Sequence, residues 1–207
     1  MDGIGFVVRV GVRTTYRVLG TGDVFVTTEV NPDPTLPDLA RIGLQMTVPG
    51  GFETITWYGR GPHESYVDRK CGVPIGKYSG AVADQLFPYV MPQESGNKAD
   101  VRWATLTNDD SAGLLVAMVP GGVALNVNAM HFTDQDLLAA YHTNELTPRD
   151  DITFSVDAAQ MGLGGASCGP GVLPQYRVKA QPLVFTVRMR GLVAGDDAAT
   201  LARTAIG

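Results

Sequence analysis

The sequence predicts an all-β fold in which antiparallel strands form a sandwich. Glycine (25 residues) and proline (13 residues) interrupt the chain about every ten residues, and the runs between them are rich in Val, Ile, Thr, Phe and Tyr. Several runs alternate polar and apolar residues, as Val184–Arg190 does, so one face of each such strand packs and the other contacts water. A chain of 207 residues can bury one substantial core.

The strands are expected between the glycine and proline signals. The first run, Phe6–Val18, is either one long bent strand or two strands. The other expected strands are Val24–Val30, Arg41–Val48, Glu53–Tyr58, Val101–Leu106, Gly113–Val119, Val123–Asn128, Asp151–Val156 and Leu183–Arg190.

The sequence contains one credible helix, Asp134–Tyr141. Thr133 is placed to cap its N-terminus, because a threonine hydroxyl can accept from a free N–H of the first turn. Leu137, Leu138 and Tyr141 are then available to face a core.

The domain organisation follows from the absence of repeats and low-complexity linkers. We expect a single domain over residues 1–193. The proline-containing stretch Asn31–Leu39 is a rigid connector or, alternatively, a domain edge. Residues 194–207 lack a β pattern and form a tail that is frayed, a short terminal helix or a cloning boundary.

The composition excludes several classes of function. The net charge is −5 and the 16 basic residues are scattered, so the chain lacks the basic patch that nucleic acid requires. No apolar run approaches the roughly 20 residues that cross a bilayer, and no secretion signal is visible. The two cysteines, Cys71 and Cys168, show no spacing typical of zinc or of a redox pair, so we expect no metal site. They fit a reducing, cytoplasmic compartment, with a distant disulfide as the alternative.

The first information-rich block is Trp57–Lys70, with the sequence WYGRGPHESYVDRK. Its glycines and Pro62 force a sharp turn that presents many polar side chains from one loop. One interpretation is a network that holds the loop in shape by pairing two arginines with two acids: Arg60, Arg69, Glu64 and Asp68. The alternatives are that His63 or Glu64 contacts a ligand, or that the loop docks on a neighbouring domain.

The second block, Pro88–Trp103, reads PYVMPQESGNKADVRW and predicts an ordered loop with a Gly96-Asn97 turn that leads into a strand. Planar amides, carboxylates and arginine are the groups that hold hydroxyl-rich ligands. Four residues of the block have such side chains: Gln93, Glu94, Asn97 and Arg102. They either hydrogen-bond a sugar or hold the first loop.

The third block, Asp157–Tyr176, reads DAAQMGLGGASCGPGVLPQY. Five glycines within ten residues indicate positive φ angles or close approach by another surface. The block has no GxxxxGK[ST] sequence, so a phosphate-binding loop is excluded. We expect this loop to lie against another domain or a ligand.

Together the three blocks resemble the C-terminal, small-chain domain of the lactase-type β-galactosidases of glycoside hydrolase family 2. The resemblance covers about Asp38 to Leu192. It implies a large antiparallel β supersandwich, similar to galactose mutarotase, with at most one or two short helices, beside a catalytic (β/α)8 barrel. That family is retaining and uses two glutamates, which the barrel provides. A barrel takes about 250 residues of alternating strand and helix, so this all-β chain contains no catalytic residue.

The resemblance also implies the role of the domain. In the family a tryptophan of the glycine-rich loop reaches the sugar site, and here Cys168 stands at that position. Ser167 and Cys168 are therefore expected to border the galactose or acceptor subsite. The implied partners are the barrel domain, a β-galactoside such as lactose and further copies in a homo-oligomer, and the family's Mg and Na lie mostly outside this domain. The isolated chain is expected to be inactive.

One alternative is an aldose 1-epimerase-like protein, in which a histidine and a glutamate shuttle protons. The candidates are His63, His131, His142, Glu94 and Glu145. However, His131 has apolar neighbours typical of a core or edge residue, and His142 would end the predicted helix.

Two further alternatives are a non-catalytic carbohydrate-binding module and a stand-alone glycosidase. A module needs an exposed aromatic platform, but Trp57 and Trp103 lie at strand ends, where burial is favoured. A glycosidase would use Glu64 and Glu94, whose neighbouring arginines would lower a carboxyl pKa that a general acid needs raised.

Overall fold

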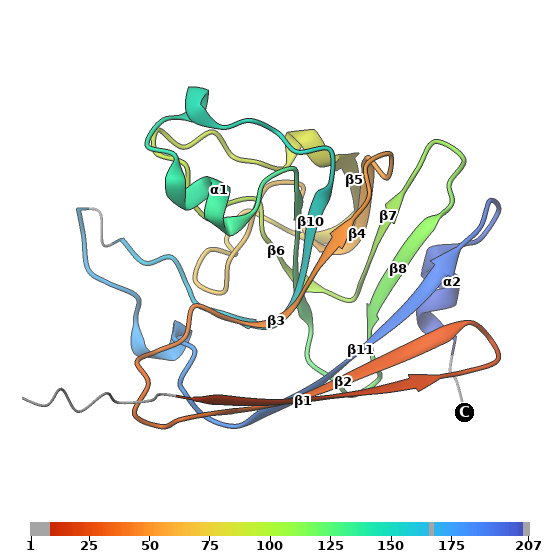
Figure 1. The fold of residues 1–207 in the computed structure, drawn as a ribbon, viewed down its shortest axis with the longest axis horizontal. Helices are drawn as coiled ribbons and strands as arrows, with labels where there is room; N and C mark the ends of the chain where they lie inside the picture. Colours follow the sequence, from red (N-terminus) through yellow and green to blue (C-terminus); the bar gives the residue numbers. More distant parts are fainter. Residues whose placement is uncertain (1–8, 166–167, 205–207) are drawn as a thin grey trace, which may run out of the picture.

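The computed structural model describes residues 9–165 and 168–204, and these form two stacked antiparallel β-sheets (Figure 1). The all-β prediction is confirmed, with two short α-helices. From edge to edge, the larger sheet contains β1 (Val10–Val18), β2 (Asp23–Pro32), β11 (Leu183–Leu192), β8 (Gly113–Met118), β7 (Trp103–Thr107), β4 (Thr54–Arg60) and β5 (Ile75–Ala81). The smaller sheet contains β3 (Arg41–Val48), β10 (Ile152–Gln160), β9 (Leu125–Met130) and β6 (Lys98–Val101).

The main core lies between the two sheets, and the period-2 pattern of the strands explains it. Alternate residues of β10, Ile152, Phe154 and Val156, are fully buried, and so are Val127 on β9 and Val187 on β11. The intervening residues point away from this core. The outer face of the smaller sheet is thereby left for polar side chains.

Two strands were missed by the sequence prediction. β5 contains two glycines in seven residues and is a half-exposed edge strand, so it carries little apolar signal. The expected strand Val101–Leu106 is in fact divided: β6 belongs to the smaller sheet and β7 to the larger one, and the chain crosses between them at Arg102. The Arg102 N–H donates to Tyr58 O at 2.8 Å, which fixes the crossing.

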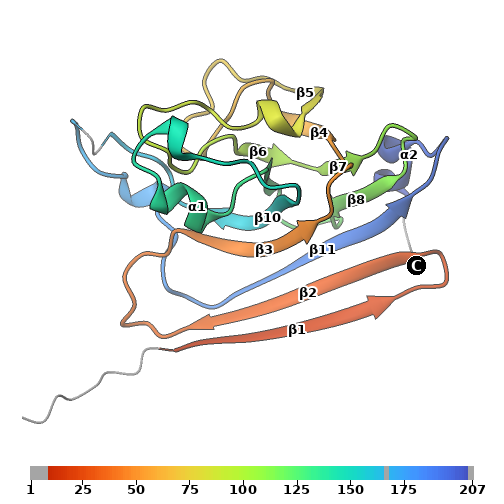
Figure 2. The ribbon, with the colours of Figure 1, turned by 45° about the horizontal axis from the view of Figure 1, so that its top comes forward.

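The hairpin of β1 and β2 forms one edge of the molecule (Figure 2). In the described part β1 is a single strand that begins at Val10, and all nine of its residues are exposed. Its cross-strand partners place Val12 beside Val30 and Tyr16 beside Val26, both of which are buried. The core-facing surface of the larger sheet therefore continues onto β1, where no described residue covers it.

Helix α1 (Asp134–Ala139) is shorter than predicted. Thr133 caps it as expected, in a capping box with Asp136. The backbone turns extended at Ala140, so only Leu137 is buried; Leu138 (84% exposed) and Tyr141 (70% exposed) do not face a core, contrary to the prediction. A helix of six residues offers one core-facing position here.

The region after residue 193 contains helix α2 (Ala198–Arg203), which is one of the outcomes expected for the tail. Its apolar side packs against Trp103, Leu115, Ala117 and Leu192 on the outer face of the larger sheet. Neither described helix has the length and apolar character needed to cross a bilayer.

Candidate functional site

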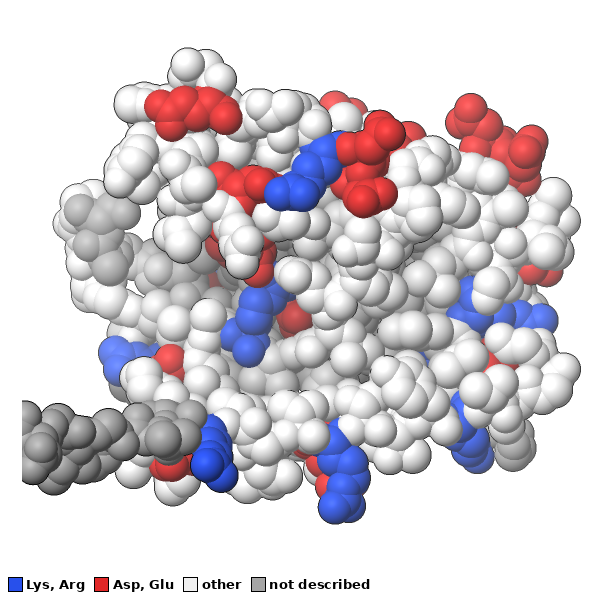
Figure 3. All heavy atoms as spheres, in the orientation of Figure 1, with Lys and Arg blue, Asp and Glu red and all other residues white. Residues whose placement is uncertain are grey.

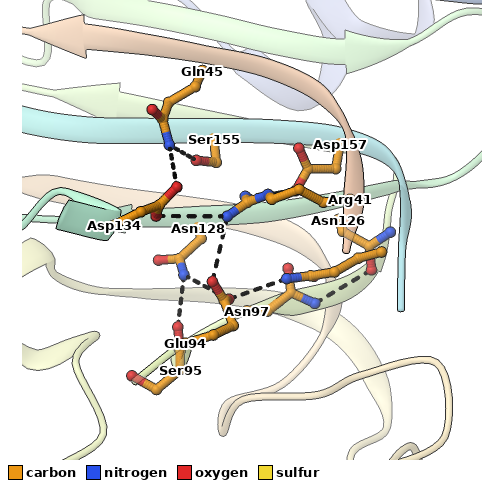
Figure 4. Close-up of polar contacts among 12 residues, drawn as sticks. Arg41, Gln45, Glu94, Ser95, Asn97, Asn126, Asn128, Asp134, Ser155 and Asp157 are labelled. Carbon is orange, nitrogen blue, oxygen red and sulfur yellow. Dashed lines mark hydrogen bonds and ion pairs between the residues drawn. The ribbon is translucent and has the colours of Figure 1, made fainter. Parts of the chain in front are cut away.

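The outer face of the smaller sheet holds a polar cluster centred on Arg41 (Figure 4). Arg41 begins β3 and Asp157 lies on the adjacent strand β10, where both point away from the core. Glu94 comes from the loop before β6, and Asp134 is the first residue of α1. Four segments distant in sequence thus bring three carboxylates to one guanidinium.

Arg41 contacts all three carboxylates. Its Nε and Nη2 donate to Oδ2 of Asp157 at 3.0 and 2.6 Å, and its Nη1 lies 3.3 Å from Oε2 of Glu94. Oδ1 of Asp134 is 4.0 Å from the same Nη1. The Asp157 side chain is 4% exposed and that of Glu94 is 34% exposed, so Asp157 is the buried member of the cluster.

One arginine cannot neutralise three acids, and the pKa values reflect this. Burial raises the pKa of the Asp157 carboxyl to about 6, and Arg41 offsets only part of this effect. Burial also raises the pKa of Glu94. The cluster therefore contains a carboxyl group that changes its protonation state near neutral pH.

Amide side chains complete the surroundings of Glu94. Its Oε1 accepts from Gln160 Nε2 at 3.1 Å, from Asn128 Nδ2 at 3.4 Å and from the Tyr66 hydroxyl at 3.4 Å. Among described residues, Oδ1 of Asn128 and Oε1 of Gln160 are buried without a hydrogen-bond partner. Two amide oxygens beside Glu94 therefore have unused acceptor capacity inside the protein. No group of three or more His, Cys, Asp or Glu among the described residues could hold a metal ion.

Glu64 belongs to a different group. Its carboxylate accepts from Arg69, from the Tyr89 hydroxyl at 2.5 Å and from Gly96 N–H at 2.6 Å. The predicted pairing of Glu64 with Arg69 is confirmed. His63 is exposed, and together with Glu64 it lines a cavity of about 470 Å³.

Arg60 does not pair with Glu64 or Asp68, contrary to one interpretation of the first block. It donates to Asp100 Oδ2 at 2.5 Å and to Val73 O at 3.0 Å. Lys70 Nζ contacts the other oxygen of Asp100 at 2.6 Å. Arg60 therefore joins the first block to β6, the edge strand of the smaller sheet.

Asp68 holds the glycine-rich block. Its carboxylate accepts from Leu163 N–H at 3.1 Å and from Gly164 N–H at 2.8 Å. A Cβ on Gly162 would lie 2.6 Å from the same carboxylate, and Gly164 has a φ of +62°. Close approach and positive φ were both predicted, but the surface that approaches Gly162 belongs to this chain.

Of the two expected rim residues, the structure describes only Cys168, which belongs to that loop. Cys168 is exposed, and its N–H donates to Gly165 O at 3.2 Å. Ser167 lies outside the described residues. Cys71 and Cys168 are both free thiols, so the alternative of a disulfide between them is not realised.

Two more candidates of the second block, Asn97 and Gln93, are structural or peripheral. Asn97 is buried and donates to Ser65 O at 2.8 Å and to Asn126 Oδ1 at 3.3 Å, so it holds the first loop. Gln93 is exposed and donates to Met91 O at 3.2 Å. The six candidate contacts predicted from sequence thus do not form one site.

The histidines do not join a glutamate at the polar cluster. His131 Nε2 lies 2.9 Å from Glu53 and His142 Nδ1 lies 3.0 Å from Glu145. His142 follows the end of α1 and is not part of it. Glu64 lines the 470 Å³ cavity, and Glu94 is not among the residues that line it.

Sequence reasoning missed Arg41, Asp157, Asp134 and Gln160. The only signal in the sequence was that these polar residues occupy positions beside apolar ones in strands or at a helix start, which indicates that they face away from the core. Arg41 and Asp157 are 116 residues apart, so no local pattern could pair them.

The fold and the site define an all-β sandwich whose smaller sheet has a polar, hydrogen-bonded outer face. The family model described as "Beta galactosidase small chain" matches residues 4–189. The chain therefore belongs to the β-galactosidase small-chain family.

Individual relatives agree with the family. The chain is 40% identical over 151 residues to a β-galactosidase of Priestia megaterium, covering 73% of the chain and 14% of the relative. It is 37% identical over 168 residues to a β-galactosidase of Lactobacillus delbrueckii subsp. bulgaricus (81% and 16%) and 34% identical over 170 residues to β-galactosidase BgaC of Bifidobacterium adolescentis (81% and 16%). The chain thus spans about a sixth of the length of these relatives.

Proposed function

We propose that this chain is the C-terminal domain of a retaining β-galactosidase that hydrolyses terminal β-D-galactosides such as lactose. In this proposal the chain completes the wall of the sugar pocket, and the two catalytic glutamates lie in a barrel domain elsewhere in the enzyme. The family's Mg and Na would also be bound mostly there. The isolated chain has no activity of its own.

The observation that carries the proposal is the uncovered inner face of β1. Val10, Val12, Tyr16 and Val18 are 47–71% exposed, although they continue the core-facing surface of the larger sheet. A long, exposed, apolar edge strand is a liability in a protein that works alone. Further polypeptide packed over β1 would remove that liability, as expected for a domain of a larger enzyme.

The position of the glycine-rich loop supports the pocket role. Asp68 ties the loop to the first block, so its tip with Cys168 projects from a fixed base. Both cysteines are free and exposed, which is compatible with the cytoplasmic compartment that we propose. In Figure 3 most acidic side chains lie in the upper part of the face shown and most basic side chains in its lower part.

The first experiment tests association and uses two valines that are both 62% exposed. Val12 lies on the inner face of β1, and Val184 lies on the outer face of β11, beside Glu29. The chain is produced together with, or fused to, the polypeptide that carries the barrel, and hydrolysis of o-nitrophenyl β-galactoside is measured. We expect Val12→Asp to reduce assembly and activity at least tenfold and Val184→Asp to leave both unchanged. Equal behaviour of the two variants would contradict the docking role of β1.

The second experiment tests the pocket rim in the assembled enzyme. Cys168→Trp places an aromatic ring at the loop tip, and we expect KM for lactose or for an acceptor sugar to change several-fold. An unchanged KM and unchanged acceptor affinity would contradict the rim assignment.

The isolated chain provides the third measurement. It should neither hydrolyse the chromogenic galactoside nor accelerate galactose mutarotation, and it should not bind galactose saturably. Hydrolysis would support a stand-alone glycosidase, mutarotation an epimerase, and saturable binding a carbohydrate-binding module. The burial of Trp57 (2% exposed) and Trp103 (5%) confirms the sequence prediction and leaves no exposed tryptophan platform for such a module.

A further inference from the structure

The outer face of the larger sheet carries a row of side chains that crosses all seven strands. The residues are cross-strand partners of one another, and aromatic rings and cations dominate the row. From β1 to β5 they are Arg17, Phe25, Arg188, Ala117, Trp103, Tyr58 and Lys77.

Helix α2 covers the middle of this row. It packs on Ala117 and Trp103, and Arg188 anchors it by donating to Leu201 O at 2.8 Å and Thr204 O at 3.2 Å. Arg188 is itself fixed by the buried Asp23, 2.7 Å away. The family match ends at residue 189 and α2 begins at 198, so the helix lies outside the matched residues.

A cavity of about 540 Å³ lies between α2 and the strands. Tyr58 and Trp103 form its aromatic part, with ring centroids 6.4 Å apart and planes inclined by 25°. Tyr58 is 40% exposed, while Met118, Ala199 and other apolar atoms make up most of the remaining lining. This size and lining are typical of sites for small molecules.

Three cations line the same cavity: Lys77, Arg102 and Arg203. Lys77 Nζ lies 6.0 Å from the Trp103 ring centroid, and Arg102 Cζ lies 6.0 Å from that of Tyr58. No aspartate, glutamate, asparagine or glutamine is among the lining residues, and within the described ranges none of the three cations forms a salt bridge.

Asp197, at the start of α2, is a nearby acid whose charge interacts with Lys77, so it offsets part of the positive charge of the three cations. The carboxylate of Asp197 accepts from the backbone N–H groups of Ala199 and Thr200 and from the Thr200 hydroxyl at 2.5 Å, and thus caps the helix. The chain as a whole carries a net charge of −5. In contrast, positive charges exceed negative ones beside these aromatic rings, and this local excess favours an anion there.

We propose that this cavity binds a small amphipathic anion, with a planar aromatic body against Tyr58 and Trp103 and one sulfonate, carboxylate or phosphate group near Lys77, Arg102 and Arg203. A neutral sugar fits less well, because the lining has no carboxylate or amide side chain to accept from hydroxyl groups. This site is separate from the polar cluster around Arg41 and does not depend on the proposed function.

The test uses 8-anilinonaphthalene-1-sulfonate as the probe, titrated into the 207-residue chain and followed by fluorescence. N-phenyl-1-naphthylamine has the same rings without the sulfonate and serves as the neutral control. We expect the anionic probe to bind at least tenfold more tightly than the neutral one, and its affinity to fall with added salt.

Four variants locate the site. Lys77→Gln combined with Arg102→Gln should weaken binding of the anionic probe at least tenfold, and Ala199→Glu, which places an acid in the cavity, should do the same. Arg13→Gln removes an exposed cation of β1, and Val12→Asp alters the exposed apolar face of β1; both should bind the probe as the parent does. Circular dichroism confirms that each variant is folded.

The proposal is overturned if the charge variants bind the anionic probe as tightly as the parent chain. Equal affinity for the neutral probe would also overturn it, and so would loss of binding in Val12→Asp, which would place the probe on β1.

Discussion

Replacing Asp157 with Asn should change how the stability of this protein depends on pH. Asp157 is 4% exposed, and both of its contacts with Arg41 use the same carboxylate oxygen. Asparagine keeps the size and an acceptor oxygen but cannot ionise. The substitution therefore removes the protonation equilibrium of this one carboxyl group and leaves the packing volume almost unchanged.

The size of the effect follows from the raised pKa of Asp157. The ordinary value is 3.8 and burial raises it to about 6. Each pKa unit corresponds to about 1.36 kcal/mol, so the group contributes roughly 3 kcal/mol. The pKa is higher in the folded state, so this stability is fully present below pH 3.8 and is lost as the pH rises through about 6.

The assay is urea unfolding of both proteins between about pH 4 and pH 8. Other carboxyl groups titrate in both proteins, so the informative quantity is the stability of the variant minus that of the parent. We expect this difference to rise by about 2.4 kcal/mol between pH 4 and pH 7, because a small part of the stabilisation is already lost at pH 4.

Asp136→Asn serves as the control of opposite sign. The hydrogen bond from Arg149 is the largest effect on the pKa of Asp136 and lowers it. The ionised Asp136 therefore stabilises the folded state above pH 3.8, and this stabilisation is lost only as the pH falls below that value. Its difference from the parent should stay flat from about pH 5 to pH 8. If the Asp157→Asn difference is also flat, or falls with pH, then Arg41 keeps Asp157 ionised and the reasoning from burial is wrong.

Two further substitutions test the scaffold. Asp23→Asn leaves Arg188 without its buried charged partner and should lower the free energy of unfolding in urea by about 3–5 kcal/mol. Glu29→Gln breaks an exposed 3.9 Å ion pair with Arg13 and should lower it by less than about 1 kcal/mol. Similar losses in the two variants would contradict the importance of burial for the Asp23–Arg188 pair. Gly96→Ala places a Cβ 2.2 Å from Gln85 O at a residue with a φ of +74°, whereas Gly51 has a φ of +94° and no atom within 4 Å of an added Cβ. We expect Gly96→Ala to lower the free energy of unfolding by about 1–3 kcal/mol more than Gly51→Ala does. Equal melting temperatures for the two variants would contradict the steric argument.

Much of the site was not predictable, and Glu94 illustrates why. The second block identified Glu94 as a polar loop residue, but its partners Arg41, Asn128 and Gln160 lie 53, 34 and 66 residues away in the chain. Short-range spacing contains no information about such pairs. In contrast, Glu64 and Arg69 are five residues apart, and the pairing was predicted because one loop holds both.

The sequence by itself determined the all-β class, most strand positions, the Thr133 cap and the family resemblance, because these depend on local alternation, turn residues and motif order. Only the tertiary structure decided that Val101–Leu106 is divided between two sheets, that Asp68 holds the glycine-rich loop, and that Asp157 shares Arg41 with two other acids. These features arise from packing between segments that are distant in sequence. The burial of each side chain, and the charges around it, depend on all the residues that pack against it, and no local pattern in the sequence specifies them.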